Sequence, residues 1–425
     1  MDACDRPECP RPDTLSLNLR ERLDLGLSRS GTKVVLHGHV DWCCTPVERL
    51  QDFKPPFCPN PDCPEHRRTT RGFRYGESGS FALKNGRKVK RYRCKTCGRS
   101  FCKKTFSLTY WLKRPELLLP IAAGLQAGSA HRQLARNLGC APSTVTRQAA
   151  RIGRHCMLLN ERALNSMAQA PNEPIVFDHF ETFEFTQDLP FGVATPVGAE
   201  SWFVYGIDPA PHRRSGRRSP AQLRRLRARP RREDHGGYHA STLRTVQRLL
   251  GLKRHSEPLH LIADDHPAYR AALARLDDPD RVRLEVHRNP KRGPKGAPRS
   301  VAALARDRAM FPVDLLHRLI RHSLAAHRRE TIAFGRRLNA LMERLYVFVA
   351  WRNFIKGRSE RKPDPETPAM RLGLTQRPWS WRMVLARRLF PAREGLQGVC
   401  RELYQRNWTT PVLPNNRRHD LKLAY

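Results

Sequence analysis

The stretch Leu259-His-Leu-Ile-Ala-Asp-Asp-His-Pro-Ala-Tyr269 is an apolar run that ends in two adjacent carboxylates. Its length and bounding residues are typical of a buried β-strand, and Pro267 suits the first turn of a following helix. The pattern therefore predicts an acid, Asp264 or Asp265, at the carboxyl end of a strand. In open α/β sheets, ligands and chemistry are usually found at that edge. Asp is also a good helix cap, so the pair could simply open the helix.

A second strand followed by an acid lies upstream, in Pro174-Ile-Val-Phe-Asp178. Apolar and β-branched runs predict two further strands after it, over residues 192–197 and 202–207. A helix over 241–250 leads into the first stretch, and a last strand is expected over 281–287. Residues 312–356 have the pattern of a long amphipathic helix, with a buried stripe in its second half. This order of strands and helices predicts an α/β fold with a mixed sheet and flanking helices.

The amino-acid composition indicates the chemical class of the binding partner. The 425 residues are enough for two or three domains, and 78 Lys and Arg against 40 Asp and Glu give a net charge of +38. Such an excess predicts a polyanionic partner. No apolar run approaches the roughly eighteen residues that cross a membrane, and no signal-peptide pattern opens the chain. We therefore expect a soluble, non-secreted protein without a membrane partner, whose cysteines are reduced.

Two cysteine pairs carry the most specific local signal. Cys58 and Cys63 are separated by about thirty basic, Gly-rich residues from Cys94 and Cys97. Paired cysteines at these spacings form two knuckles that can close a tetrahedron around one structural Zn²⁺ ion. The spacing predicts a zinc ribbon over residues 57–108, with His66 and Cys102 as alternative ligands.

The surroundings of these pairs give weaker signals. Aromatic residues alternate with basic residues in the ribbon, which predicts a basic, partly aromatic surface for nucleic-acid contact: Tyr75, Phe81, Tyr92 and Phe101. The N-terminal segment, residues 1–56, has no assignable role. Its four cysteines are a weak candidate for a second metal site: Cys4, Cys9, Cys43 and Cys44.

Residues 109–170 have a helical pattern. A helix over 130–138, a tight turn containing Gly139, and a helix over 143–151 are typical of a helix-turn-helix DNA-binding domain. Its last helix would place four residues against DNA: Ser143, Thr144, Arg147 and Arg151. A plain three-helix packing module is the alternative.

Other basic segments interrupt or follow the α/β region. An Arg-rich insertion occupies about 209–238, and a Pro/Gly/Lys/Arg loop follows at 289–299. Both are natural contacts for phosphate groups. A basic C-terminal extension, residues 357–425, contains one expected short helix around 381–389.

This order of zinc ribbon, helix-turn-helix and α/β region resembles the insertion-sequence transposases that have an RNase H-like catalytic core, here residues 171–356. The resemblance implies a DDE or DDD triad of acids. Asp178 matches the first position. Asp264 matches the second, because Tyr269 completes the family's Asp-x-x-x-x-Tyr pattern. His179 departs from the pattern, since many relatives have a second acid there.

The third acid is expected among Asp314, Glu330 and Glu343. If residues 312–356 form one continuous helix, Glu330 lies nearly opposite Asp314 around the axis, and Glu343 lies about 43 Å further along it. Asp314 sits in the first turn of that helix, so it is the preferred candidate. A break near residues 326–330 would remove this argument against Glu330.

The resemblance also implies the chemistry and the partners. Three acids would hold two Mg²⁺ or Mn²⁺ ions for DNA cleavage and strand transfer. The expected partner is double-stranded DNA, at the element's terminal repeats and at the target, bound by a homodimer or a larger assembly. The expected location is the cytoplasm of a prokaryote, at the nucleoid. Two alternatives remain: a DNA-binding regulator with an inactive RNase H-like domain, and a nuclease without strand transfer.

Overall fold

The computed structural model describes residues 53–408, except 68–71, 84–85, 168–171, 214–215, 217, 229–234, 254–256, 291–292, 295 and 361–363. All described residues belong to one compact unit. The second cysteine group of the N-terminal segment lies outside the described residues, as do residues 409–425 and parts of the Arg-rich insertion.

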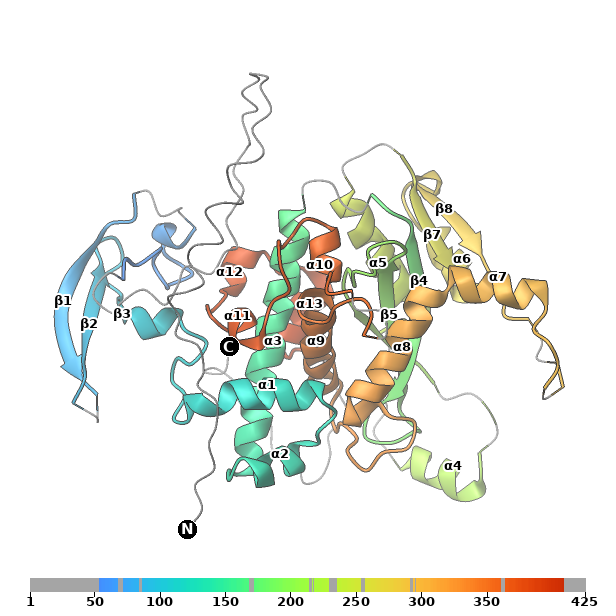
Figure 1. Cartoon of the computed structure of the whole chain (residues 1–425), viewed down its shortest axis with the longest axis horizontal. Coiled ribbons are helices and arrows are strands. Elements are labelled where there is room, and N and C mark those ends of the chain that lie inside the picture. The colour runs from blue at the N-terminus through green and yellow to red at the C-terminus, as the bar shows by residue number, and fades with distance from the viewer. Residues whose placement is uncertain are drawn as a thin grey trace, which may run out of the picture. The chain divides into compact units, whose positions relative to one another are not determined.

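Figure 1 shows the elements in the described part of the chain. The strands are β1 (Tyr75–Ala82), β2 (Lys88–Cys94), β3 (Ser100–Cys102), β4 (Ile175–Phe183), β5 (Pro190–Gly198), β6 (Asp208–Pro211), β7 (Leu259–Ala263) and β8 (Val282–Val286). The helices are α1 (Leu118–Gln126), α2 (His131–Asn137), α3 (Pro142–Ser166), α4 (Pro220–Arg227), α5 (Gly237–Leu252), α6 (Pro267–Leu273), α7 (Val301–Ala309), α8 (Phe311–Ser323), α9 (Leu338–Phe354), α10 (Pro368–Arg371), α11 (Trp381–Val384), α12 (Pro391–Glu394) and α13 (Gly398–Gln405). In these residues, no helix is both long and apolar enough to span a bilayer.

The first sheet is small and antiparallel, in the order β1-β2-β3. Its aromatic residues face inward rather than forming a surface. Tyr92 and Phe101 are each only 5% exposed and stack at 6.0 Å, with Tyr75 packed against their cluster. The expectation of an aromatic contact surface is therefore wrong for these residues, because a sheet this small needs them for its core. Its exposed side chains include Lys88, Lys90 and Arg91.

The second sheet is mixed, in the order β6-β5-β4-β7-β8, which confirms the expected α/β class. The central strand β4 pairs antiparallel with β5 and parallel with β7, and β8 extends the parallel side. Two boundaries differ from expectation. Asp178 lies inside β4 rather than after it, since pairing with β5 continues to Phe183. The strand expected over 202–207 is replaced by β6, because the chain turns at Trp202, whose φ is 61°.

Helices cover both faces of this sheet, as the alternation of side chains in β4 shows. His179 is within 3.3 Å of Ser241 on α5, whereas the ring of its neighbour Phe180 packs against His317 on α8 at 5.3 Å. Successive residues of a strand point to opposite faces. Helix α5 therefore lies on one face of the sheet and α8 on the other.

Helix α3 is much longer than the 143–151 expected, and its C-terminal part packs against α9. The two helices meet at Gly153, where a Cβ atom would lie 2.4 Å from the carbonyl oxygen of Glu343. Only glycine leaves room for this approach. The crossing ties the N-terminal helices to the end of the α/β region (Figure 1).

The continuous helix expected over 312–356 is wrong. Helix α8 ends at Ser323 and α9 begins at Leu338. The intervening segment is held by the β4–β5 connection: the Phe185 N–H donates to the Gly335 carbonyl at 2.8 Å, and Glu184 Oε1 accepts from the Leu338 N–H at 2.8 Å. These long-range hydrogen bonds hold residues 324–337 in a connection outside both α-helices, although the helical spacing of apolar residues continues through it.

The C-terminal extension packs onto the rest of the described chain and contains α10 to α13 rather than one helix. The Arg388 N–H donates to the Phe106 carbonyl at 2.9 Å, and the ring of Phe390 contacts that of Phe57 at 5.2 Å. Further on, Arg406 forms a two-point ion pair with Glu343. The extension therefore connects the small sheet with α9.

Candidate active site and metal centre

Asp178 and Asp264 lie side by side at the centre of the mixed sheet. In the parallel pair β4 and β7, Phe177 is the register partner of Ala263, so the next residue of each strand is one of the two acids. Asp265, the alternative at the second position, is exposed and forms ion pairs with Arg270 at 3.2 Å and Arg288 at 2.8 Å. Asp264 is therefore the acid that faces Asp178.

The surroundings of the Asp178 carboxyl group disfavour its ionised form. Its side chain is only 22% exposed, and Oδ1 accepts the His179 N–H at 2.7 Å and the Tyr269 hydroxyl at 3.2 Å. Burial raises the pKa of Asp178 to about 7, and the charge of Asp264 contributes to this rise. A divalent cation at this position would relieve both effects.

The three candidates for a third acid differ in their surroundings. Asp314 lies in the first turn of α8, and its charge also contributes to the raised pKa of Asp178. Glu343 is buried between Arg406 at 2.6 Å and Arg154 at 3.9 Å, so its role is structural. Glu330 is exposed in the segment between α8 and α9, and the angular argument against it does not hold because the helix is broken.

Asp314 is not a ready-made metal ligand, because Arg306 forms an ion pair with both of its oxygens. This arginine lies on α7, an element that the sequence pattern did not predict. Metal binding by Asp314 would require the ion pair to open.

His317 is a site residue that sequence reasoning did not single out. Its Nδ1 lies 3.8 Å from Asp178 Oδ2, and its Nε2 lies 2.8 Å from the Thr195 hydroxyl. That hydroxyl donates to the Asp178 carbonyl, so Nε2 carries the proton and the Nδ1 lone pair faces the carboxylate. Burial lowers the pKa of His317 to about 3, so the ring is neutral. Its spacing of three from Asp314 on a polar helix face was the available signal.

The ring of His179, which stands where the resembling family often has an acid, lies on the opposite face of the sheet from this group. It is 5% exposed, and its ring lies between Tyr238 at 4.2 Å and Tyr269 at 5.5 Å. Burial lowers the pKa of His179, so its ring stays neutral. Its Nδ1 lies 3.1 Å from the Tyr269 hydroxyl, so it contacts the side chain that binds Asp178.

The second candidate centre is the cysteine cluster of the small sheet. Cys58, Cys63, Cys94 and Cys97 bring one sulfur each within 4.8 Å of one another, and no other described residues form such a group. The Cys58–Cys97 and Cys63–Cys94 sulfur distances are 3.6 and 3.9 Å. Tetrahedral zinc with bonds of about 2.3 Å separates its sulfurs by about 3.8 Å, so the four thiols fit the ion.

The two alternative zinc ligands lie outside this cluster. His66 is buried, its Nδ1 is 2.7 Å from the Cys58 carbonyl oxygen, and its ring packs against Phe57 and Phe390. The Cys102 thiol lies beside the Thr105 hydroxyl. His66 therefore supports the backbone of a knuckle.

Three of the four predicted DNA-facing residues are accessible at the start of α3. Ser143 and Arg147 are exposed and Thr144 is half-buried. The fourth prediction is wrong: Arg151 is 4% exposed, and its guanidinium donates to the carbonyls of Leu108 at 2.8 Å and Tyr110 at 2.6 Å. Because these carbonyls belong to the preceding loop, Arg151 cannot reach DNA.

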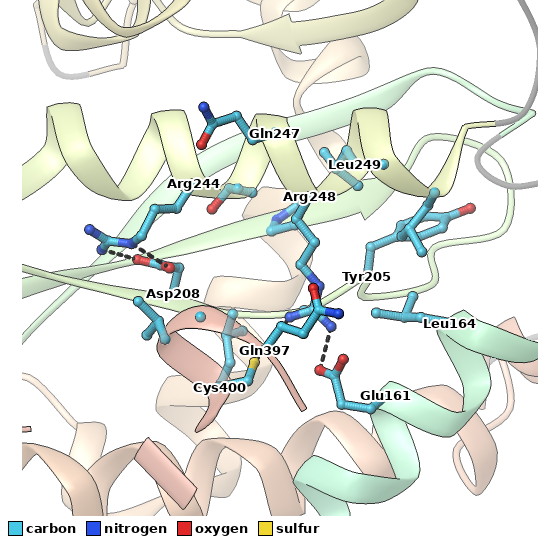
Figure 2. Close-up of a pocket in the computed structure, with 18 of the residues that line it drawn as sticks. Glu161, Leu164, Tyr205, Asp208, Arg244, Gln247, Arg248, Leu249, Gln397 and Cys400 are labelled. Carbon is cyan, nitrogen blue, oxygen red and sulfur yellow. Dashed lines mark hydrogen bonds and ion pairs between the residues drawn. The ribbon is translucent and has the colours of Figure 1, made fainter. Parts of the chain in front are cut away.

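Two cavities lie in the described part of the α/β region and its neighbouring helices. A cavity of about 220 Å³ near the end of β4 is lined by three arginines, Arg321, Arg328 and Arg329. A larger one of about 500 Å³ lies between α3, α5 and the C-terminal extension (Figure 2). Its charges are already paired, Arg244 with Asp208 and Arg248 with Glu161.

The larger cavity also contains a thiol. Burial raises the pKa of Cys400 to about 11, so the thiol is protonated and unreactive at neutral pH. The basic cavity near β4 is the better candidate for contact with a charged ligand such as phosphate.

Comparison of the chain with protein-family models, with characterised proteins and with solved structures finds no match. Function is therefore argued from the two centres themselves.

Proposed function

We propose that this chain is a DNA transposase of an insertion sequence, with an RNase H-like catalytic core that cleaves and joins DNA. The observation that carries the proposal is the neighbouring placement of Asp178, inside β4, and Asp264, directly after the parallel strand β7. The strand order β6-β5-β4-β7-β8, with an antiparallel first half and a parallel second half, also supports an RNase H-like core.

The roles of the residues follow from their surroundings. Asp178 and Asp264 would hold divalent ions, with Asp314 or His317 completing the site. When bound there, two Mg²⁺ or Mn²⁺ ions would supply the positive charge that activates an attacking hydroxyl and stabilises a leaving oxygen. Tyr269 orients Asp178 through its hydroxyl, and the arginines near the end of β4 would contact the DNA backbone.

The N-terminal half would bind the ends of the element. The four cysteines would hold one Zn²⁺, and α2 with the start of α3 would form a helix-turn-helix that places Ser143, Thr144 and Arg147 in the major groove. The net charge of +38 supports double-stranded DNA as the partner. We further propose a prokaryotic cytoplasmic protein that acts on paired ends as a dimer or larger assembly.

The test is incubation of the purified protein with DNA that carries the flanks of its own gene, in Mn²⁺ or Mg²⁺. We expect nicked and joined products from the wild type, and their loss in Asp178→Asn and Asp264→Asn with DNA binding retained. Asp265→Asn is the matched control, because this neighbouring acid is exposed and points to Arg270 and Arg288. Binding without any nicking by the wild type would favour the regulator, and cleavage without joining would favour a nuclease.

A further inference from the structure

The loop between the small sheet and α1 presents an unusual side chain. Trp111 is 67% exposed, and its backbone φ is 60°. A bulky residue in the left-handed region is strained, and such strain persists only where the surroundings impose it. A large exposed indole at a strained position is therefore held there by other residues.

Helix α3 supplies the groups that hold it. The buried Arg151 guanidinium binds the Leu108 and Tyr110 carbonyls, which precede Trp111. The Gln148 side-chain amide donates to the Arg114 carbonyl, which follows it, at 3.0 Å. The backbone on both sides of Trp111 is thus fixed to one helix, which holds the residue at the surface.

The position of this turn relates it to the DNA-facing start of α3. Ser143, Arg147 and Arg151 are spaced by four residues, so they share one face of the helix. The first two are exposed, and the third is covered by the loop that carries Trp111. A ligand lying over Ser143 and Arg147 would meet this loop one turn further on.

The loop that carries Trp111, residues 103–117, is basic. Lys104 and Lys113 are exposed, and the one nearby acid in the loop, Glu116, is paired with Arg114 at 2.8 Å. A positively charged surface with one protruding aromatic ring suits a polyanion that carries flat rings, which is a nucleic acid. An acidic protein would offer the charge but no partner for the ring.

We propose that Trp111 stacks on a nucleobase that is unpaired or displaced from the duplex, beside the DNA-reading start of α3. The inference rests on the DNA binding proposed above and adds a site to it. In an intact duplex the faces of the bases are covered by their neighbours, so a stacking indole favours single strands, mismatches and opened ends.

The test compares Trp111→Ala with wild type on three fluorescent probes: a single-stranded oligothymidine, a duplex, and the same duplex with a central mismatch. We expect Trp111→Ala to weaken binding to the first and third by about tenfold, the loss of one base–aromatic stack, with little change on the intact duplex. Trp111→Phe should retain most of the affinity, and Ile332→Ala, which removes a fully exposed apolar side chain elsewhere, should change nothing.

Trp111→Gly separates the stack from folding. Glycine relieves the positive φ, so this variant should be as stable as wild type while it loses the preference for unpaired DNA. Equal affinity of Trp111→Ala and wild type on every probe would overturn the proposal. An equal loss of affinity on all three probes would also overturn it. So would a variant that binds every probe normally but no longer self-associates. If the wild type binds no DNA, the proposed DNA-binding function itself fails.

Discussion

At the scale of single residues, Asp178 makes stability depend on pH. Its pKa of about 7 exceeds the usual value of 3.8, so the folded protein holds this proton more tightly than the unfolded chain. The stabilisation is therefore complete below about pH 4 and is lost as pH rises through 7. At about 1.36 kcal/mol per unit, the loss reaches a few kcal/mol when no metal is bound.

We accordingly predict that Asp178→Asn raises the melting temperature of the metal-free protein at pH 8 and leaves it nearly unchanged at pH 4. Mn²⁺ should raise the melting temperature of the wild type at pH 8 and have a smaller effect on the variant. Calorimetric scans at the two pH values measure both. A variant that is less stable than wild type at pH 8 would show that the carboxylate has a charged partner.

The third ligand is tested by Asp314→Asn, His317→Ala and Glu330→Gln. Loss of cleavage by several orders of magnitude in Asp314→Asn, with DNA binding preserved, is expected if the Arg306 ion pair opens during catalysis. His317→Ala reports on the Nδ1 lone pair that faces Asp178. If His317→Ala abolishes cleavage and Asp314→Asn does not, the site is two acids and a histidine. Sole loss in Glu330→Gln would refute both.

The residues that could be predicted are those whose signal is local. Cys58, Cys63, Cys94 and Cys97 are set by knuckle spacing, and Asp264 by the end of one strand. Arg151 was placed wrongly and the contacts of His317 were not foreseen, because the partners of both side chains lie far away in the sequence. The carbonyls bound by Arg151 are 41 and 43 residues away, and Thr195 is 122 residues from His317.

At the scale of elements, we predict that the small sheet needs a bound metal ion to stay folded. Cys94→Ser should remove about one zinc per chain and unfold the sheet, since its core of a few aromatic rings is too small to be stable alone. Cys102→Ser is the matched control, because this thiol lies outside the four. Zinc content by atomic absorption and end binding by mobility shift measure the result. Equal zinc in both variants would contradict the assignment.

The crossing of α3 and α9 makes a second prediction. Gly153→Ala would place a methyl group against the Glu343 carbonyl. We therefore expect the free energy of unfolding to fall by about 1–3 kcal/mol. Gly251→Ala, in α5 with nothing within 4 Å of the added carbon, should be neutral or gain up to about 1 kcal/mol. Urea titrations of both variants decide. Similar free energies of unfolding for the two variants would mean that α3 and α9 accommodate the added methyl group without a steric penalty.

Elements with one clear period were predicted well, and those set by distant contacts were not. Of the expected stripe, Leu338, Leu341, Leu345 and Phe348 are buried, whereas Phe334 precedes α9 and is only half-buried. The break before them was missed because Glu184 and Phe185, far away in sequence, fix it. The same holds for β6, which begins after a turn that the apolar run at 202–207 conceals.

At the scale of the whole molecule, the ion pair of Arg406 with Glu343 fastens the C-terminal extension to α9. Glu343 is 2% exposed, so removing Arg406 leaves a buried carboxylate whose closest remaining ion-pair partner is Arg154 at 3.9 Å. We predict that Arg406→Ala costs about 3–5 kcal/mol in the free energy of unfolding. Burial already raises the pKa of Glu343, so the loss should shrink as acid protonates it.

A double variant provides the control for this pair. Glu343→Gln with Arg406→Ala removes the uncompensated charge, so it should recover part of the loss seen in Arg406→Ala alone. Chemical denaturation at pH 5 and pH 8 measures both effects. If the single and double variants unfold alike, the pair contributes nothing to the attachment of the extension.

The contacts of Arg388, Phe390 and Arg393 with the small sheet constrain how the chain is made. A ribosome releases residues 57–106 long before it releases 388–393, so the early part must wait for the last part before its packing is complete. Contacts this distant in sequence form slowly, and the exposed intermediate is prone to aggregation. Translation that stops before residue 388 would yield a chain that lacks these contacts.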